Sequence, residues 1–257
     1  MSEELVIAGR KFRSRLMLGT GKYKTFELMK EALDASGCEI VTVAVRRVNL
    51  DKPQEKSLLD YIDRNKYFIL PNTAGCYSVD EAVRIARLGK AAGLTNWVKL
   101  EVIADPKYLF PDPIATIEAA KILIKEGFIV LPYTTDDVTV AKKLAEIGCS
   151  TVMPGASFIG SGQGVPNYAK IKLIKASVSV PVVVDSGIGC ASDAAVAMET
   201  GADACLINTA VAEAENPVLM AESMKLAVEA GRKSFLSGRM PVREYASASS
   251  PAAGISK

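Results

Sequence analysis

The feature that most constrains the fold is one unit repeated along the chain: a short apolar run, a polar or glycine-rich turn, and a segment with helical periodicity. The runs are apolar throughout, which is typical of parallel strands covered on both faces. In the intervening segments, such as FELMKEALDAS, apolar residues return every three or four positions, as in an amphipathic helix. The eight predicted strands are Leu16–Gly21, Glu39–Val45, Tyr67–Asn72, Trp97–Ile103, Phe128–Tyr133, Ser150–Gly155, Val180–Gly187 and Ala204–Ala210.

Residues at the ends of the helical segments indicate where helices begin and end. Several glycines follow the point where the helical pattern stops, the position where a left-handed C-cap favours glycine. Asn216 precedes Pro217, and this pair predicts an N-cap followed by proline at the first helical position. The glycines are Gly37, Gly93, Gly127, Gly148, Gly201 and Gly231.

Eight such units predict a single-domain α/β fold, the (β/α)8 TIM barrel, which runs to about 250 residues; this chain has 257. The opening LVIAGRKFRSR predicts a short hairpin at the bottom of the barrel. We expect the barrel domain to span residues 1–243, and the small, polar residues 244–257 to form a flexible tail. An open doubly wound sheet is the alternative, but no GxGxxG motif follows the first strand to support its dinucleotide-binding version.

The composition excludes several classes of function. The formal net charge is only +2, so general attraction to nucleic acid or a membrane is not expected, and any anion must be bound locally. The absence of a signal-like segment and of a long apolar run predicts a soluble, cytoplasmic protein. The five cysteines are scattered without a CxxC pair, which predicts reduced thiols, not a disulfide frame or zinc site.

The chain contains no histidine. Histidine triads, histidine-ligated metals and histidine acid–base catalysis are therefore excluded. Proton transfer then falls to Asp, Glu, Lys, Tyr, Cys or the substrate, and we expect neither a metal nor a cofactor.

Polar, glycine-rich loops follow the last three predicted strands. The sixth ends in PGASFIGSGQG, the seventh in DSGIG and the eighth in NTA. Functional groups of a TIM barrel lie at these C-terminal strand ends, and backbone N–H groups and hydroxyls there can bind phosphate. Any one loop could be only a tight turn; together they predict an anion site.

The fourth predicted strand lies in NWVKLEV, an apolar run that carries two charges. Lys99 and Glu101 are two positions apart, so both face the upper interior of the barrel. They are either a buried ion pair that holds the strand, or a site in which a desolvated lysine attacks a carbonyl to form an imine. Asp185, at the end of the seventh strand, is either a second carboxylate at this mouth or a cap for the next helix.

A series of phrases runs through nearly the whole chain in order: LVIAGRKFRSRLMLGTGKY, VTVAVRR, LPNTAGCY, NWVKLEVI, EGFIVLPY, IGSGQG, VDSGIG, NTA and YASASSP. On these phrases the chain resembles the thiazole synthase family of bacterial-type thiamin biosynthesis. The resemblance implies that Lys99 forms a Schiff base with the ketone of 1-deoxy-D-xylulose 5-phosphate, while Glu101 and Asp185 move protons. The implied substrate contacts are Gly160, Ser186, Gly187, Asn208 and Thr209.

The same resemblance implies further reactants and an assembly. Sulfur would come from the C-terminal thiocarboxylate of a small sulfur-carrier protein with a ubiquitin-like fold. Dehydroglycine (iminoacetate) would supply the remaining C–N unit, and the product would be a carboxylated thiazole phosphate. The family implies a homotetramer, and its YASASSP phrase suggests that the tail orders near the active site or the docking surface of the carrier.

Two positions depart from the family pattern. Phe158 stands where the family commonly has proline, which bears on the path of that loop and its closure over substrate. Ser186 replaces the usual alanine and adds a hydroxyl. Cys76 and Cys190 follow the third and seventh strands; we interpret them as ordinary thiols rather than persulfide carriers, because the family takes sulfur from a partner.

Two other functions fit the same residues. A class I aldolase or isomerase of a phosphosugar would use the same lysine, acids and loops, and would turn over a sugar phosphate without a sulfur donor. A non-catalytic phosphosugar-binding barrel would keep the loops but leave Lys99 paired with Glu101.

Overall fold

The structure is a computed structural model that describes residues 4–48 and 57–250. Eight parallel strands lie in the order β10, β9, β6, β5, β4, β3, β12, β11, so that each neighbours the next along the chain. Parallel bridges from Val152 to Val182 and from Gly155 to Asp185 join β10 to β11, which confirms the predicted barrel. The strands are β3 (Leu16–Gly19), β4 (Ile40–Ala44), β5 (Phe68–Asn72), β6 (Trp97–Leu100), β9 (Ile129–Thr134), β10 (Met153–Pro154), β11 (Val183–Asp185) and β12 (Ala204–Ile207).

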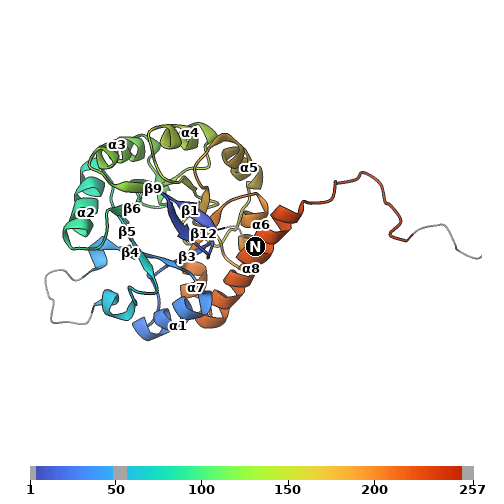
Figure 1. The fold of residues 1–257 in the computed structure, drawn as a ribbon, viewed down its shortest axis with the longest axis horizontal. Helices are drawn as coiled ribbons and strands as arrows, with labels where there is room; N and C mark the ends of the chain where they lie inside the picture. Colours follow the sequence, from blue (N-terminus) through green and yellow to red (C-terminus); the bar gives the residue numbers. More distant parts are fainter. Residues whose placement is uncertain (1–3, 49–56, 251–257) are drawn as a thin grey trace, which may run out of the picture.

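Helices surround this ring of strands (Figure 1). Apolar residues on the outer faces of the strands, such as Val41 and Val130, are buried in clusters with helix residues such as Met29 and Leu123. The elements are α1 (Phe26–Ser36), η1 (Val45–Arg47), η2 (Leu58–Tyr61), α2 (Val79–Ala91), α3 (Pro113–Lys125), α4 (Val138–Glu146), α5 (Tyr168–Ser177), α6 (Ala191–Glu199), α7 (Thr209–Ala212) and α8 (Pro217–Ser237); η1 and η2 are 3-10 turns.

The predicted helix ends are confirmed with one exception. Gly37 caps α1 in the left-handed conformation, at a φ of 59°, and the Asn216 side chain accepts a hydrogen bond from the Leu219 N–H at the start of α8. Gly231 does not end a helix, because α8 continues to Ser237. A Cβ at Gly231 would lie 2.5 Å from the Ala195 carbonyl of α6, so this glycine instead permits close packing of two helices.

The predicted hairpin closes the lower end of the barrel. Strands β1 (Leu5–Ile7) and β2 (Arg10–Phe12) pair antiparallel, and the hairpin lies across the ring in Figure 1. Leu5, Ile7 and Phe12 form one buried cluster with inward-facing strand residues that include Trp97 and Val183. The lower interior is therefore filled with apolar side chains.

Two strands end three residues earlier than predicted, for different reasons. The fourth predicted strand ends at Leu100, because Ile103 pairs instead with Pro111 in a second antiparallel hairpin of β7 (Ile103–Asp105) and β8 (Phe110–Pro111). The last predicted strand ends at Ile207, because α7 begins at Thr209. Both differences place additional backbone at the upper end of the barrel.

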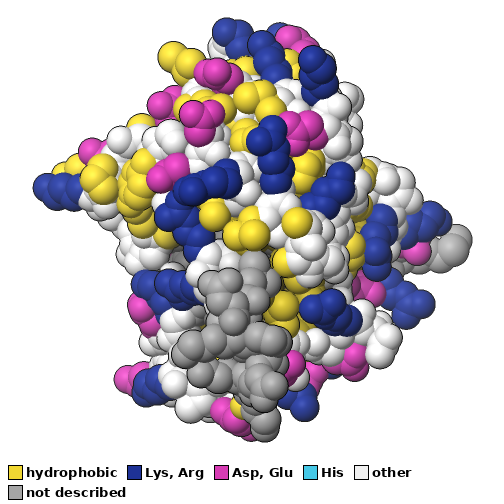
Figure 2. Space-filling view, turned by 90° about the vertical axis from the view of Figure 1, so that its left-hand side faces the viewer, with side chains coloured by type: hydrophobic (Ala, Val, Ile, Leu, Met, Phe, Trp, Pro, Cys, Tyr) yellow, Lys and Arg dark blue, Asp and Glu magenta, His cyan; other side chains and the backbone are white. Residues whose placement is uncertain are grey.

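Beyond α8, residues 238–250 form no helix or strand and extend away from the barrel (Figure 1). On the face in Figure 2, acidic and basic side chains are interspersed, in keeping with the small net charge of +2. In the described residues, no helix is both long and apolar enough to span a membrane.

Candidate active site

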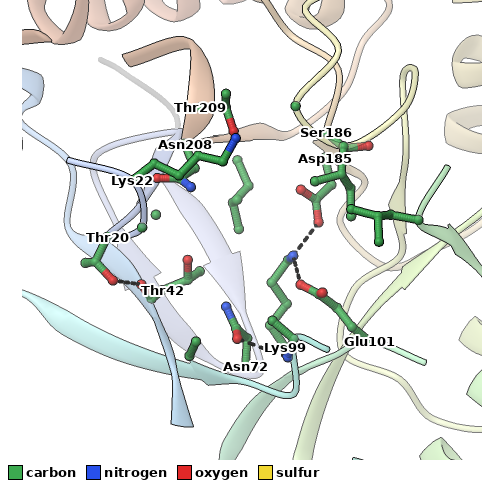
Figure 3. A pocket seen from close by; sticks show the side chains of 18 of the residues that line it. Thr20, Lys22, Thr42, Asn72, Lys99, Glu101, Asp185, Ser186, Asn208 and Thr209 are labelled. Atoms are coloured by element: carbon green, nitrogen blue, oxygen red, sulfur yellow. Dashed lines mark hydrogen bonds and ion pairs between the residues drawn. The ribbon is translucent and has the colours of Figure 1, made fainter. Parts of the chain in front are cut away.

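A cavity of about 460 Å³ opens at the C-terminal ends of the barrel strands. This volume lies in the range of small-molecule sites. The structure brings every sequence-predicted site residue to its lining: Lys99, Glu101, Gly160, Asp185, Ser186, Gly187, Asn208 and Thr209. Figure 3 shows the labelled side chains converging on this space from strands on opposite sides of the ring.

Lys99 lies between two carboxylates. Its Nζ is 2.6 Å from Glu101 Oε1 and 2.8 Å from Asp185 Oδ2 (Figure 3). The three residues are only 5%, 6% and 4% exposed, respectively. The Thr73 hydroxyl accepts from the Glu101 N–H at 2.7 Å and donates to the Glu101 carbonyl at 2.8 Å, which fixes the backbone just beyond β6. The charged group is therefore preorganised.

Burial and charge act in opposite directions on the protons of this group. Burial lowers the pKa of Lys99, but the charges of Asp185 and Glu101 outweigh it, and the pKa lies above the ordinary lysine value. Burial also raises the pKa of Asp185, against the opposing charge of Lys99. The resting lysine is thus an ammonium ion, and the proton affinity of Asp185 is higher than that of an ordinary aspartate.

Glycines give one side of the cavity its shape. Gly160 has a φ of 72°, and a Cβ there would lie 3.6 Å from Thr209 Oγ1 and 3.7 Å from Lys22 Nζ. Figure 3 shows the end of the Lys22 side chain beside Thr209. At Gly187 a Cβ would lie 1.9 Å from Ser157 Oγ, so only glycine fits. The Thr209 hydroxyl, the Lys22 ammonium group and a backbone without side chains at the glycines are suited to binding a phosphate on this side of the cavity.

Asn208 connects this side to the first barrel strand. With its amide nitrogen turned toward the backbone, it donates to the carbonyls of Gly19 at 3.3 Å and Gly21 at 3.0 Å. A Cβ on Gly19 would lie 2.6 Å from Asn208 Cβ. The NTA and GTG phrases of the sequence are therefore in direct contact, and Asn208 holds the cavity wall as well as lining it.

The two departures from the family pattern have distinct surroundings. Ser186 has a φ of 57°, and its hydroxyl donates to the Ser157 carbonyl at 2.8 Å, tying β11 to the loop after β10. Phe158 packs against Tyr108 and Phe110 of the β7–β8 hairpin, with ring centroids 5.4 and 5.0 Å apart. The aromatic ring thus joins two loops at the upper end of the barrel.

Sequence reasoning missed three residues that line the cavity and one that lies beside Lys99. Lys22, Arg46 and Arg47 line the cavity, and each follows the end of a barrel strand in GTGKY or VAVRR. Their positions just after strand ends were the sequence signal that could have identified them. Tyr133, in β9, lies with its ring centroid 5.5 Å from Lys99 Nζ, and burial raises the pKa of its phenol to about 12.

Among the described residues, the cysteines and the acids form no further arranged site. Cys76 is fully buried, with its Sγ 3.5 Å from Arg46 Nη2, and burial raises the pKa of its thiol. Cys190 is exposed at the start of α6. No group of three or more Cys, Asp and Glu side chains in the described part of the chain is placed to hold a metal ion.

The fold and site define a TIM-barrel enzyme built around a buried lysine. The model of the family described as "Thiazole biosynthesis protein ThiG" matches residues 6–251. The chain belongs to this family, the thiazole synthases of thiamin biosynthesis.

Curated relatives match over almost their whole length. The thiazole synthase of Solibacter usitatus is 58% identical over 256 residues, 99% of each chain. That of Aquifex aeolicus is 57% identical over 251 residues, 98% of this chain and 94% of the relative. The fold is also similar to the structure described as an Amycolatopsis orientalis BexX/CysO complex, with a TM-score of 0.84 and 35% identity over 94% of this chain and 98% of that one. A thiamine phosphate pyrophosphorylase from Pyrococcus furiosus shares the fold alone, with a TM-score of 0.60 and 18% identity over 84% of this chain and 95% of that one.

Proposed function

We propose that this enzyme forms a thiazole phosphate from 1-deoxy-D-xylulose 5-phosphate, dehydroglycine and the thiocarboxylate of a sulfur-carrier protein, through a Schiff base on Lys99. One observation carries the proposal: the buried Lys99 Nζ lies between Glu101 and Asp185, at 2.6 and 2.8 Å, in a cavity bounded by glycine-rich loops. A structural pair in a core gains little over apolar residues, so a buried charged group that lines a cavity favours a chemical role.

The imine step balances with the loss of one water. Lys99 Nζ bonds to C2 of the sugar, the C2–O bond breaks once its oxygen has accepted protons, and water leaves. Because the resting lysine is an ammonium ion, it must first give up a proton. We assign this proton to Asp185, which lies 2.8 Å from the nitrogen and whose pKa is raised by burial, and we assign the later transfers along the sugar to Glu101.

The remaining parts of the proposal concern binding and assembly. Gly160, Ser186, Gly187, Asn208 and Thr209 would contact the phosphosugar, with its phosphate at the glycine-rich side of the cavity. The similar BexX chain is described in complex with a second protein, CysO, which supports a protein as the sulfur donor. We further propose a homotetramer, a cytoplasmic location, a barrel domain over residues 1–243 and a separate tail over 244–257.

Reductive trapping tests the Schiff base directly. The protein would be incubated with 1-deoxy-D-xylulose 5-phosphate, reduced with borohydride and digested, and the added mass located by mass spectrometry. We expect the adduct on Lys99 and none in Lys99→Ala. Lys175→Ala is the matched control, because Lys175 also pairs with an aspartate, at 2.6 Å, but lies outside the cavity.

Three results would contradict the proposal. An adduct elsewhere would displace Lys99 from its role. No adduct, with the sugar shown to bind, would favour a binding protein. Turnover of the phosphosugar without a sulfur donor would favour an aldolase or isomerase.

A further inference from the structure

We infer that Arg46 and Arg47 form a second anion site that binds the carboxylate of the small imino acid substrate. The inference rests on the proposed function and extends it to the residues that bind dehydroglycine. Both arginines line the cavity, and both stand in the η1 turn at the C-terminal end of β4.

The arginines and the phosphate side of the cavity start from different strands. Gly160 follows β10, Thr209 follows β12 and Lys22 follows β3, and these three residues form the side of the cavity suited to phosphate. The arginines follow β4, which neighbours β3 and is four strands from β10 in either direction. They therefore extend the cationic lining from Lys22 toward β5.

The arginine side chains lie along the wall between β3 and β5. Arg46 Nη2 is 3.5 Å from both Cys76 Sγ and Glu81 Oε2, which holds the guanidinium over the loop after β5. Arg47 Nη1 lies 3.4 Å from the place a Cβ on Gly21 would occupy, on the β3 side. The two guanidinium groups thus border the same cavity over the loops on either side of β4, and a planar guanidinium matches the two oxygens of a carboxylate.

The described cationic side chains of the cavity have different partners. Lys99 lies between Glu101 and Asp185, and Lys22 pairs with Glu213 at 2.9 Å. Arg46 lies 3.5 Å from Glu81. With a phosphate bound beside Lys22, the arginine pair is left to receive a second substrate anion.

The reactants supply a matching second anion. Dehydroglycine carries a carboxylate next to its imine carbon, and the carboxylated thiazole phosphate carries its carboxylate and its phosphate on opposite sides of the ring. A ligand with two anions fits a cavity whose cationic lining extends from Lys22 to the two arginines. Binding the carboxylate at the arginines would orient the C–N unit toward the sugar carbons held at Lys99.

Steady-state kinetics of Arg46→Gln and Arg47→Gln test the inference. Iminoacetate would be generated from glyoxylate and ammonium, which condense with loss of water, under saturating phosphosugar and carrier thiocarboxylate. We expect the KM for glyoxylate to rise about 10- to 100-fold in either variant, because each variant loses one charge-assisted hydrogen-bonding contact with the carboxylate. Arg46→Lys keeps the charge without the planar fork and is expected to recover only part of the affinity. Arg84→Gln, an exposed arginine of α2 outside the cavity, is the control.

Two further measurements on the same variants identify the ligand. Borohydride trapping with the phosphosugar alone should be unchanged, and so should the KM for the carrier thiocarboxylate. Reduced trapping would assign the arginines to the phosphosugar, and a raised KM for the carrier alone would assign them to the thiocarboxylate. Variants with unchanged trapping and unchanged KM values would show that the arginines bind none of the three reactants. Each of these results would overturn the inference. Failure of the wild type to trap any adduct would overturn the proposed function itself, and the inference with it.

Discussion

At the lower end of the barrel the hairpin buries Leu5, Ile7 and Phe12 against apolar strand side chains, whereas the upper end buries a lysine between two carboxylates. The same strands supply both layers. On β6, Trp97 packs in the lower cluster and Lys99, two residues later, faces the cavity. On β11, Val183 packs in the lower cluster and Asp185, two residues later, lines the cavity.

Burial of side chains stabilises the fold in the lower layer and costs free energy in the upper layer. Each large apolar side chain buried at the lower end stabilises the fold by about 1.5–3 kcal/mol. At the upper end, desolvation of three charges costs free energy that their attraction offsets only in part. The comparison teaches that this barrel separates stability from chemistry along its axis, and three substitutions test how complete the separation is.

The largest effect is expected for Asp185→Asn, on activity. Loss of a proton acceptor should lower kcat about 10²- to 10⁴-fold, while Glu101 still pairs with Lys99 at 2.6 Å and maintains the fold. The pH dependence gives a sharper readout. Imine trapping should rise with pH as Lys99 loses its proton, and the midpoint should move to lower pH in the variant, because Asp185 is one cause of the raised pKa of Lys99. A midpoint that moved to higher pH would contradict the assigned charges, and a large loss of thermal stability would show that the upper end also holds the fold together.

The next effect is expected for Phe12→Ala, on stability. Phe12 is 4% exposed and lies with its ring centroid 6.0 Å from that of Phe68 and 6.3 Å from that of Trp97. Its truncation should lower the free energy of unfolding by about 3–5 kcal/mol in urea titrations, with kcat within about twofold of the wild type. Val6→Ala is the matched control, because Val6 is on the other face of the same hairpin and is 45% exposed. A fall in kcat in the folded Phe12 variant would show that the lower layer supports the chemistry.

The smallest effect is expected for Ser186→Ala, which introduces the residue that the resemblance implies is usual at this position. The loss of the hydrogen bond to the Ser157 carbonyl, at 2.8 Å, should lower the free energy of unfolding by about 1 kcal/mol. A loosened loop after β10 should raise the KM for the phosphosugar by about two- to fivefold. An increase in stability in the alanine variant would show that the extra hydroxyl strains this turn.

The fold was predictable to the level of its repeating unit, because strand and helix periods and glycine caps are local properties of the chain. Gly231 shows the limit: a glycine that permits two helices to approach has the same local pattern as one that caps a helix. The β7–β8 hairpin was missed for a related reason. Ile103 continues an apolar run, and only its pairing with Pro111 removes it from the sheet.

The site was predictable where position along a strand determines direction. The spacing of Lys99 and Glu101 placed both side chains on the inner face, and the strand ends gathered the glycine-rich loops. Lys22, Arg46 and Arg47 were not identified, because a long side chain beyond a strand end can point into the cavity or into solvent. Tyr133 was missed because an aromatic residue in an apolar strand has the same pattern whether it packs in the core or beside the lysine.

The hairpin that fills the lower end also limits the route by which reactants can enter the barrel. In the proposed reaction, with that end closed by packed side chains, small substrates, released water, the protein sulfur donor and product would share the upper opening. A protein terminus reaching Lys99 through that opening would block it, so the proposed reaction requires the sugar and the imino acid to bind before the donor. A covalent bond between the sugar and Lys99 would retain the sugar while the opening stays clear for the others.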